Sequence, residues 1–236
     1  MRNGSATGPV TSWSDTANAY FGGTPGKVYV SNGSNNSSIT AGTLYFTTSG
    51  YTLAPIQGNA ILATINGNFV LGQNVGLSLT AGTATSTSQL KINGSMTGAA
   101  GSSFILPSNA TSGQMNQVIL GKANSDIAVP ITITGAANTY ASLLSTTTGT
   151  KISGDITNNS AAGLLLGADL NYDLTVAGKI TGTGNVIFSG ATTSGGAGAR
   201  SPSPGSRTTP ARQPLRMHRP ARFALASATH CRPIPH

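Results

Sequence analysis

The stretch DLTVAGKITGTGNVIFSGATTSGGAG, residues 173–198, decides the fold class of this chain. One residue separates Leu174 from Val176, and one residue separates Val186 from Phe188. Runs of about five residues with this alternation are typical of short β-strands, and they are too short to be helices. The glycines between the runs adopt positive φ angles without strain, so they suit tight bends. The stretch therefore predicts a repetitive β architecture with frequent turns.

Similar short runs recur along the chain. The tetrapeptide TAGT begins at Thr40 and again at Thr80. The pattern Ile-x-Gly recurs with its isoleucine at Ile65, Ile92, Ile133, Ile152 and Ile180. These spacings predict a loose repeat of about twenty-odd residues, and periods of about 20 to 50 residues indicate solenoids, propellers or arrays.

The strand pattern distinguishes between these architectures. A propeller blade needs about 40 residues and four strands, whereas the apolar runs here are single and short. They are 44–48, 61–65, 76–79, 90–92, 104–106, 118–120 and 131–133. Residues 161–170 (AAGLLLGADL) have the most helical character, but their glycines favour a strand and a turn. We predict an all-β chain folded as a right-handed parallel β-helix, with ladders of Asn, Ser and Thr between coils.

Composition divides the chain into three parts. We predict an N-terminal cap in residues 1–26, with Trp13 covering the first strands, and β-helix repeats in residues 27–199. Residues 200–236 hold seven of the eight arginines, seven of the twelve prolines, all three histidines and the only cysteine. Such a segment has no alternation able to build a core, so we predict a disordered tail that is either out of frame with, or unrelated to, what precedes it.

The formal net charge of +8 favours nucleic acid or an anionic membrane as a partner only if the charge is spread over the fold. Before residue 200 there are six basic residues against five aspartates, so the body is close to neutral. The tail also lacks interleaved aromatic residues, so we predict no specific nucleic-acid partner.

No apolar run reaches the ~18 residues of a membrane span. Residues 1–13 lack the apolar core of a signal peptide.

Two segments carry a family resemblance. Residues 130–144 (PITITGAANTYASLL) and 176–198 (VAGKITGTGNVIFSGATTSGGAG) resemble the autotransporter-associated β-strand repeat, and the likeness extends over most of residues 10–198. The resemblance implies a passenger segment that is extracellular or on a bacterial cell surface, with no catalytic residue to carry over. A complete member of that family continues into a membrane barrel, and the residues after 198 depart from that pattern.

Carboxylates are the first candidates for chemistry. Asp169 and Asp173 flank Tyr172 and could form an acid and base pair, but a bend between two strands explains them equally well. Asp126 and Asp155 are isolated in sequence, and the chain has no glutamate. We favour the turn interpretation and predict no catalytic residue.

Other motifs are weaker. Gly121-Lys122 and Gly182-Thr183-Gly184 lack the spacing of phosphate-binding loops, so we interpret them as turns. The metal candidates are His218, His230, Cys231 and His236, whose spacing matches no zinc pattern. Sequons begin at Asn32, Asn93 and Asn109, as expected in so Asn-, Ser- and Thr-rich a chain. We predict no metal site and no cofactor.

Two function classes remain in view. The first is a non-enzymatic structural or adhesive passenger segment, whose partner is an extracellular or cell-surface polysaccharide or a host or matrix surface. The alternative is a carbohydrate-active β-helix of the polysaccharide lyase or glycosidase kind, which needs a groove with several carboxylates or basic residues.

Overall fold

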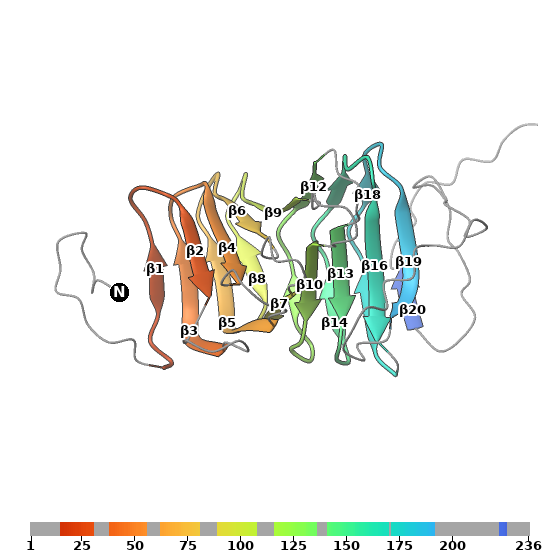
Figure 1. The fold of residues 1–236 in the computed structure, drawn as a ribbon, viewed down its shortest axis with the longest axis horizontal. Helices are drawn as coiled ribbons and strands as arrows, with labels where there is room; N and C mark the ends of the chain where they lie inside the picture. The colour runs from red at the N-terminus through yellow and green to blue at the C-terminus, as the bar shows by residue number, and fades with distance from the viewer. Residues whose placement is uncertain are drawn as a thin grey trace, which may run out of the picture.

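The computed structural model describes residues 15–30, 38–55, 62–80, 89–107, 116–135, 141–169, 171–191 and 222–225. In these residues all regular structure is β, and every strand pair in the sheets is parallel. The strands stack side by side along the long axis of the molecule, from β1 (Ala19–Phe21) near one end to β19 (Val186–Ala191) near the other (Figure 1). The prediction of an all-β parallel β-helix is confirmed.

Each coil contributes strands to three faces. Face A consists of β7 (Gln89–Asn93), β10 (Asn116–Leu120), β13 (Ala141–Ser145), β16 (Leu164–Asp169) and β19. Face B consists of β1, β8 (Met96–Gly98), β11 (Asp126–Ile127), β14 (Thr150–Ile152), β17 (Asp173–Val176) and β20 (Arg222–Leu225). Face C consists of β2 (Lys27–Val30), β4 (Tyr51–Pro55), β6 (Gly76–Leu79), β9 (Ser103–Pro107), β12 (Ile131–Thr134), β15 (Ile156–Asn158) and β18 (Ile180–Thr181).

Two longer strands join faces A and B. The first parts of β3 (Ser38–Phe46) and β5 (Leu62–Leu71) lie on face A, and their second parts lie on face B. The register of β3 against β5 shifts between Thr40 and Thr43, where the chain turns from one face to the next.

The strand register gives the length of the repeat. Ile131 pairs with Ile156, 25 residues later, and Ile156 pairs with Ile180, 24 residues later. The predicted repeat of twenty-odd residues is therefore confirmed as the length of one coil. Of the predicted strand positions, those within the described residues coincide with β3, β5, β6, β7, β9, β10 and β12.

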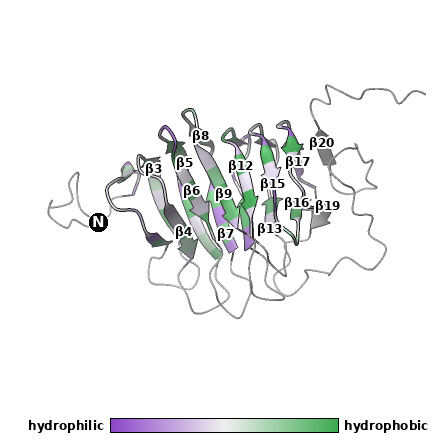
Figure 2. Ribbon diagram, turned by 90° about the horizontal axis from the view of Figure 1, so that it is seen from above, coloured by the Kyte–Doolittle hydropathy of each residue, from purple (hydrophilic) through white to green (hydrophobic). Residues whose placement is uncertain are grey.

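The core is a set of inward rows that run along the stack. On face C one such row contains Leu77, Phe104, Ile131 and Ile156, each at most 1% exposed. Apolar and polar residues alternate along the strands of this face (Figure 2). On face B the first coils contribute aromatic residues, and Phe46 packs parallel to the ring of its register partner Phe21 with centroids 4.4 Å apart.

The Ile-x-Gly isoleucines do not form a single row. Ile65 pairs with Ile92 on face A, Ile152 lies on face B, and Ile133 and Ile180 lie on face C. The glycines explain why, because those after Ile65, Ile92, Ile152 and Ile180 lie at corners where the preceding coil leaves no room for a Cβ atom. A Cβ at the glycine after Ile152 would lie 1.9 Å from a carbonyl oxygen of that coil, and one at the glycine after Ile180 would lie 2.2 Å away. The motif therefore marks a corner of the coil, whichever faces meet there, rather than one position of the coil.

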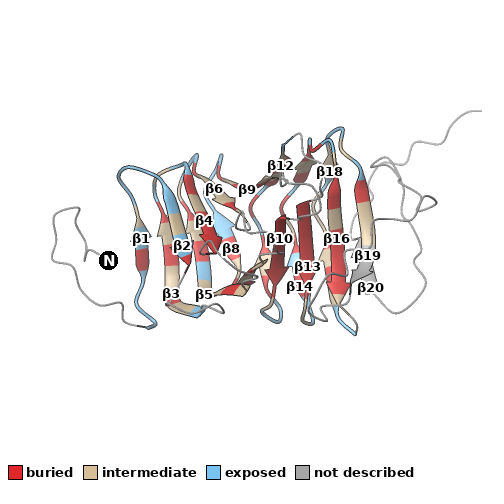
Figure 3. Cartoon of the chain, viewed as in Figure 1, coloured by how far each residue is buried: buried red, intermediate tan, exposed pale blue. Residues whose placement is uncertain are grey.

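Face A departs from the simple alternation. In β10 and β13 every residue is buried, including Ile119 and Leu144, which the alternation places on the outer side (Figure 3). This part of face A is consequently not an open surface.

The last strand comes from the Arg/Pro-rich segment. Of residues 200–236 the structure describes Arg222–Leu225, and these residues form β20, which pairs with β17. The sequence did not predict this strand. The remaining residues of the predicted disordered tail lie outside the described residues, as does Trp13 of the predicted N-terminal cap.

Candidate functional site

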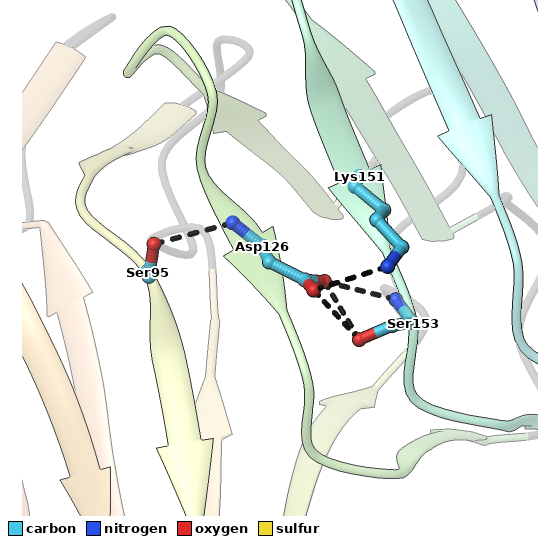
Figure 4. Close-up of polar contacts among 4 residues, drawn as sticks. All are labelled: Ser95, Asp126, Lys151 and Ser153. Carbon is cyan, nitrogen blue, oxygen red and sulfur yellow. Dashed lines mark hydrogen bonds and ion pairs between the residues drawn. The ribbon is translucent and has the colours of Figure 1, made fainter.

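The most connected polar group lies on face B around Asp126. Ser153 donates to the Asp126 carboxylate twice, from its backbone N to Oδ1 at 3.0 Å and from its Oγ to both oxygens at 2.8 Å (Figure 4). Lys151 Nζ lies 3.6 Å from Asp126 Oδ2. On the other side, the Asp126 backbone N donates to Ser95 Oγ at 3.2 Å. Three successive coils are joined through this one aspartate.

The strand register brings these residues together. Asp126 and Lys151 are direct partners in the pairing of β11 with β14, and both occupy the outer side of face B. The side chain of Lys151 is 46% exposed and that of Asp126 is 36% exposed. An ion pair with this exposure contributes at most about 1 kcal/mol to stability, so the shorter hydrogen bonds from Ser153 carry more of the interaction.

This arrangement holds coils together and does not resemble an activated nucleophile. A nucleophilic serine needs a neighbouring base that is itself free to take up its proton and is oriented by a third group. Here the carboxylate next to Ser153 is also paired with Lys151 and accepts the backbone N–H of Ser153. Asp126 is isolated in the sequence because its partners lie one coil away.

Two other aspartates make the same kind of contact. Asp155 Oδ1 accepts the backbone N–H of Lys179 at 2.8 Å, and Asp173 Oδ1 accepts that of Gly149 at 2.7 Å. In each case donor and acceptor are 24 residues apart, which is one coil. Carboxylates that accept backbone N–H groups fix the spacing between neighbouring coils.

Asparagines at the corner between faces A and B extend this pattern. Asn18 Oδ1 accepts the backbone N–H of Thr43 at 2.9 Å, and Asn68 Oδ1 accepts that of Ser95 at 3.1 Å. A separate ladder joins two side chains, because Asn93 Nδ2 donates to Asn66 Oδ1 at 2.7 Å. The predicted ladders of Asn side chains are therefore present, and the sequon asparagine Asn93 is used in one of them.

The pair of aspartates proposed as an alternative acid and base flanks a bend. β16 ends at Asp169 and β17 begins at Asp173, and between them Asn171 has a φ of 71°. The backbone N of Tyr172 donates to the carbonyl oxygen of Asp169 at 3.0 Å. The structure thus places both aspartates where the turn interpretation put them.

The glycine motifs also lie at corners. Gly121 follows β10, and Lys122 Nζ lies 3.4 Å from Asn68 Oδ1, which is 54 residues and two coils away. Gly182 follows β18 with a φ of 103°, and a Cβ at Gly184 would lie 2.5 Å from the Ser160 carbonyl oxygen. Their conformation is dictated by the close approach of coils.

The metal candidates lie outside the described residues. They are His218, His230, Cys231 and His236, and the sequons at Asn32 and Asn109 are outside as well. Within the described ranges, no group of three or more His, Cys, Asp or Glu side chains could hold a metal ion.

The outer side of face C carries a row of hydroxyl groups that the sequence did not locate. Its members occupy one register position and are Thr52, Ser78, Thr132, Thr157 and Thr181, and Ile105 interrupts the row between Ser78 and Thr132. Thr157 Oγ1 and Thr181 Oγ1 lie 3.3 Å apart. The recurrence of Ile-Thr in the sequence is the local signal for this row.

Exposed aromatic side chains gather in the first coils. Tyr20 is 70% exposed and stacks on Tyr45 with ring centroids 4.8 Å apart, and Tyr29 is 46% exposed. Together with the hydroxyl row of face C, these rings are the features of the described surface suited to contact another molecule.

Comparison with known proteins gives no match. No protein-family model, no curated protein and no solved structure matches the chain. In the part of the chain that the structure describes, no helix has the length and apolar character to cross a membrane.

Proposed function

We propose that the chain is a non-enzymatic structural or adhesive segment of a bacterial surface or secreted protein of the autotransporter-passenger type. One observation carries this proposal: Asp126, Asp155 and Asp173 each accept a backbone N–H from a neighbouring coil. An acid and base pair requires carboxylates that converge on a substrate, whereas these three maintain the stack.

The outer surface supports the adhesive part of the proposal. The hydroxyl row of face C recurs in successive coils except the one that carries Ile105, and neighbouring strands in a sheet lie about 4.8 Å apart. Many weak and equally spaced contacts on a rigid scaffold give useful avidity without any single essential residue. The partner class that fits is an extracellular or cell-surface polysaccharide, or a host or matrix surface, and the location that fits is outside the cell.

Binding and turnover measured on the same samples test the proposal. The full chain is incubated with insoluble polysaccharides and immobilised matrix proteins, and both the bound fraction and the released reducing ends are measured. We expect binding without release of sugar. Replacing Thr132 and Thr157 together by Lys should reduce binding to a neutral surface about tenfold, because it breaks the uncharged row. Thr97→Lys, an exposed change on face B, is the matched control and should have no effect.

A second double variant addresses the alternative enzyme. Replacing Asp169 and Asp173 by Asn should leave binding unchanged, because an amide oxygen can still accept the Gly149 N–H. Cleavage of a polysaccharide that this double variant abolishes would overturn the structural reading and favour the carbohydrate-active alternative. Failure to bind any of the surfaces would remove the adhesive part of the proposal.

A further inference from the structure

The edge of β17 is covered by a strand from a distant part of the sequence. β19 ends at Ala191 and β20 begins at Arg222, so thirty residues separate these strands of faces A and B. In the two preceding coils the same step takes four residues, from Ser145 to Thr150, and three residues, from Asp169 to Asp173. β20 therefore occupies the position of the next coil although it is not reached by an ordinary corner.

The sequence of β20 matches the edge that it covers. The register places Phe223 opposite Leu174 and Leu225 opposite Val176. Leu174 and Val176 belong to the inward rows of face B and are 0% and 1% exposed. The apolar positions of the two strands therefore coincide.

The polar positions match as well. Arg222 is placed opposite Asp173, and Ala224 is placed opposite Thr175. Opposite charges at partnered positions of neighbouring strands stabilise a sheet, whereas like charges destabilise it. A four-residue segment that agrees with its neighbour in apolar alternation and in charge indicates a specific pairing.

We propose that Arg222–Leu225 is a capping strand, which prevents the edge of β17 from pairing with strands of other chains. An open strand edge presents unpaired N–H and C=O groups and is a template for strand addition. The partner that this edge accepts is a parallel strand with apolar residues at alternate positions, and the same segment of a second copy has that sequence. The cap belongs to the same chain, and a tether of thirty residues gives a high local concentration. It therefore excludes the second copy at micromolar protein concentration.

The amides of β17 report on the cap directly. Successive amides of a strand point to opposite edges, and Ala177 N donates to the Ile152 carbonyl oxygen on the β14 side. The amides of Leu174 and Val176 consequently face β20, while that of Thr175 faces β14. Loss of the cap should accelerate hydrogen exchange at Leu174 and Val176 and leave Thr175 unchanged.

The test compares the full chain with Phe223→Asp/Leu225→Asp, and Ala224→Asp is the matched control. Residue-resolved hydrogen exchange, light scattering after gel filtration, and binding of a labelled peptide ARFALAS (residues 221–227) are measured for each. We expect the wild type and Ala224→Asp to be monomeric and not to bind the peptide. In the double variant we expect Leu174 and Val176 to exchange about tenfold faster or more, together with binding of the wild-type peptide.

Two results would overturn the proposal. One is equal exchange at Leu174 and Val176 in the wild type and the double variant, since the amides would then not depend on the cap. The other is peptide binding to the wild type as strong as to the double variant, since the edge would then be open. Unchanged protection of Thr175 confirms in every sample that the coils themselves remain folded.

Discussion

Gly154 lies where two coils approach each other closely, so Gly154→Ala is a direct test of the stack. The residue occupies the corner between β14 and β15, and an added Cβ would lie 1.9 Å from the carbonyl oxygen of Val129 and 2.5 Å from its carbonyl carbon. Both atoms belong to backbone, which cannot turn aside as a flexible side chain can. The coils must separate locally to admit the methyl group.

The structure gives the size of the effect. Cβ atoms essentially never approach another heavy atom closer than 3.0 Å, so the contact at Gly154 must lengthen by more than 1 Å. Three backbone hydrogen bonds span the same corner: Ser153 N to Ile127 O at 3.1 Å, Gly154 N to the same oxygen at 3.0 Å, and Ile131 N to Asp155 O at 2.7 Å. Each is worth about 0.5 to 1.5 kcal/mol. We expect Gly154→Ala to lower the free energy of unfolding by about 2 to 4 kcal/mol.

Urea denaturation followed by circular dichroism measures the effect. A slope of about 1 to 3 kcal/mol per molar urea converts the expected loss into a midpoint lower by about 1 M or more. Gly26→Ala is the control, because a Cβ there would meet nothing within 4 Å, and its midpoint should stay within measurement error of the wild type. Gly178→Ala should repeat the loss one coil further, since its Cβ would lie 2.0 Å from the Gly154 carbonyl oxygen. Equal midpoints for Gly154→Ala and Gly26→Ala would refute the close approach of the coils.

Three further expectations concern the core, the tail and the carboxylates. Ile156→Asp places a charge in a fully buried row and should lower the free energy of unfolding by about 3 to 5 kcal/mol. The same change at the adjacent Thr157, which points outward, should lower it by less than about 1 kcal/mol. Equal urea midpoints for the two variants would refute the register. Truncation after Gly198 should leave the far-UV circular dichroism of the β-helix essentially unchanged, and a large loss of β signal would contradict this. Asp126→Ala should lower the free energy of unfolding by about 1 to 2 kcal/mol, because the Ser153 hydroxyl loses both carboxylate acceptors and the Ser153 N–H keeps only the Ile127 oxygen. Lys151→Ala should lower it by less than about 1 kcal/mol, and a larger loss for Lys151→Ala than for Asp126→Ala in urea denaturation would reverse this assignment.

The strands and the repeat length were predictable because their signals are local. Alternation in 131–133 and 104–106 requires only neighbouring residues, and both runs became buried strands of face C. The faces were not predictable from the same signals. Ile-x-Gly marks a corner of the coil, whereas the face on which it lies depends on how many residues separate successive corners. Those numbers vary along this chain, and the motif consequently appears on all three faces.

The polar contacts between coils follow a different rule. Asp126 and Ser153 are 27 residues apart, and Asp155 and Lys179 are 24 residues apart, so nothing in their immediate sequence indicates an interaction. A search for polar residues separated by one coil would have found them once the coil length was known. β20 escaped prediction for another reason: four residues of alternation within an Arg/Pro-rich segment are too short to stand out.

The near-neutral body of this chain is better explained by its fold than by its partners. In a parallel stack a residue lies about 4.8 Å from its register partner in the next coil. At that distance two like charges repel by about 1 kcal/mol in water and by several times as much near a protein surface. Rows of repeated charge would accumulate this cost along the stack, whereas rows of Thr, Ser and Asn hydrogen-bond to one another.

The strand registers agree with this argument. Asp126 is the register partner of Lys151 and Asp173 is that of Arg222, and no described strand register pairs two like charges. A low charge content thus follows from the requirement that coils stack, and the excess of positive charge resides in residues 200–236, where it says little about what the β-helix binds.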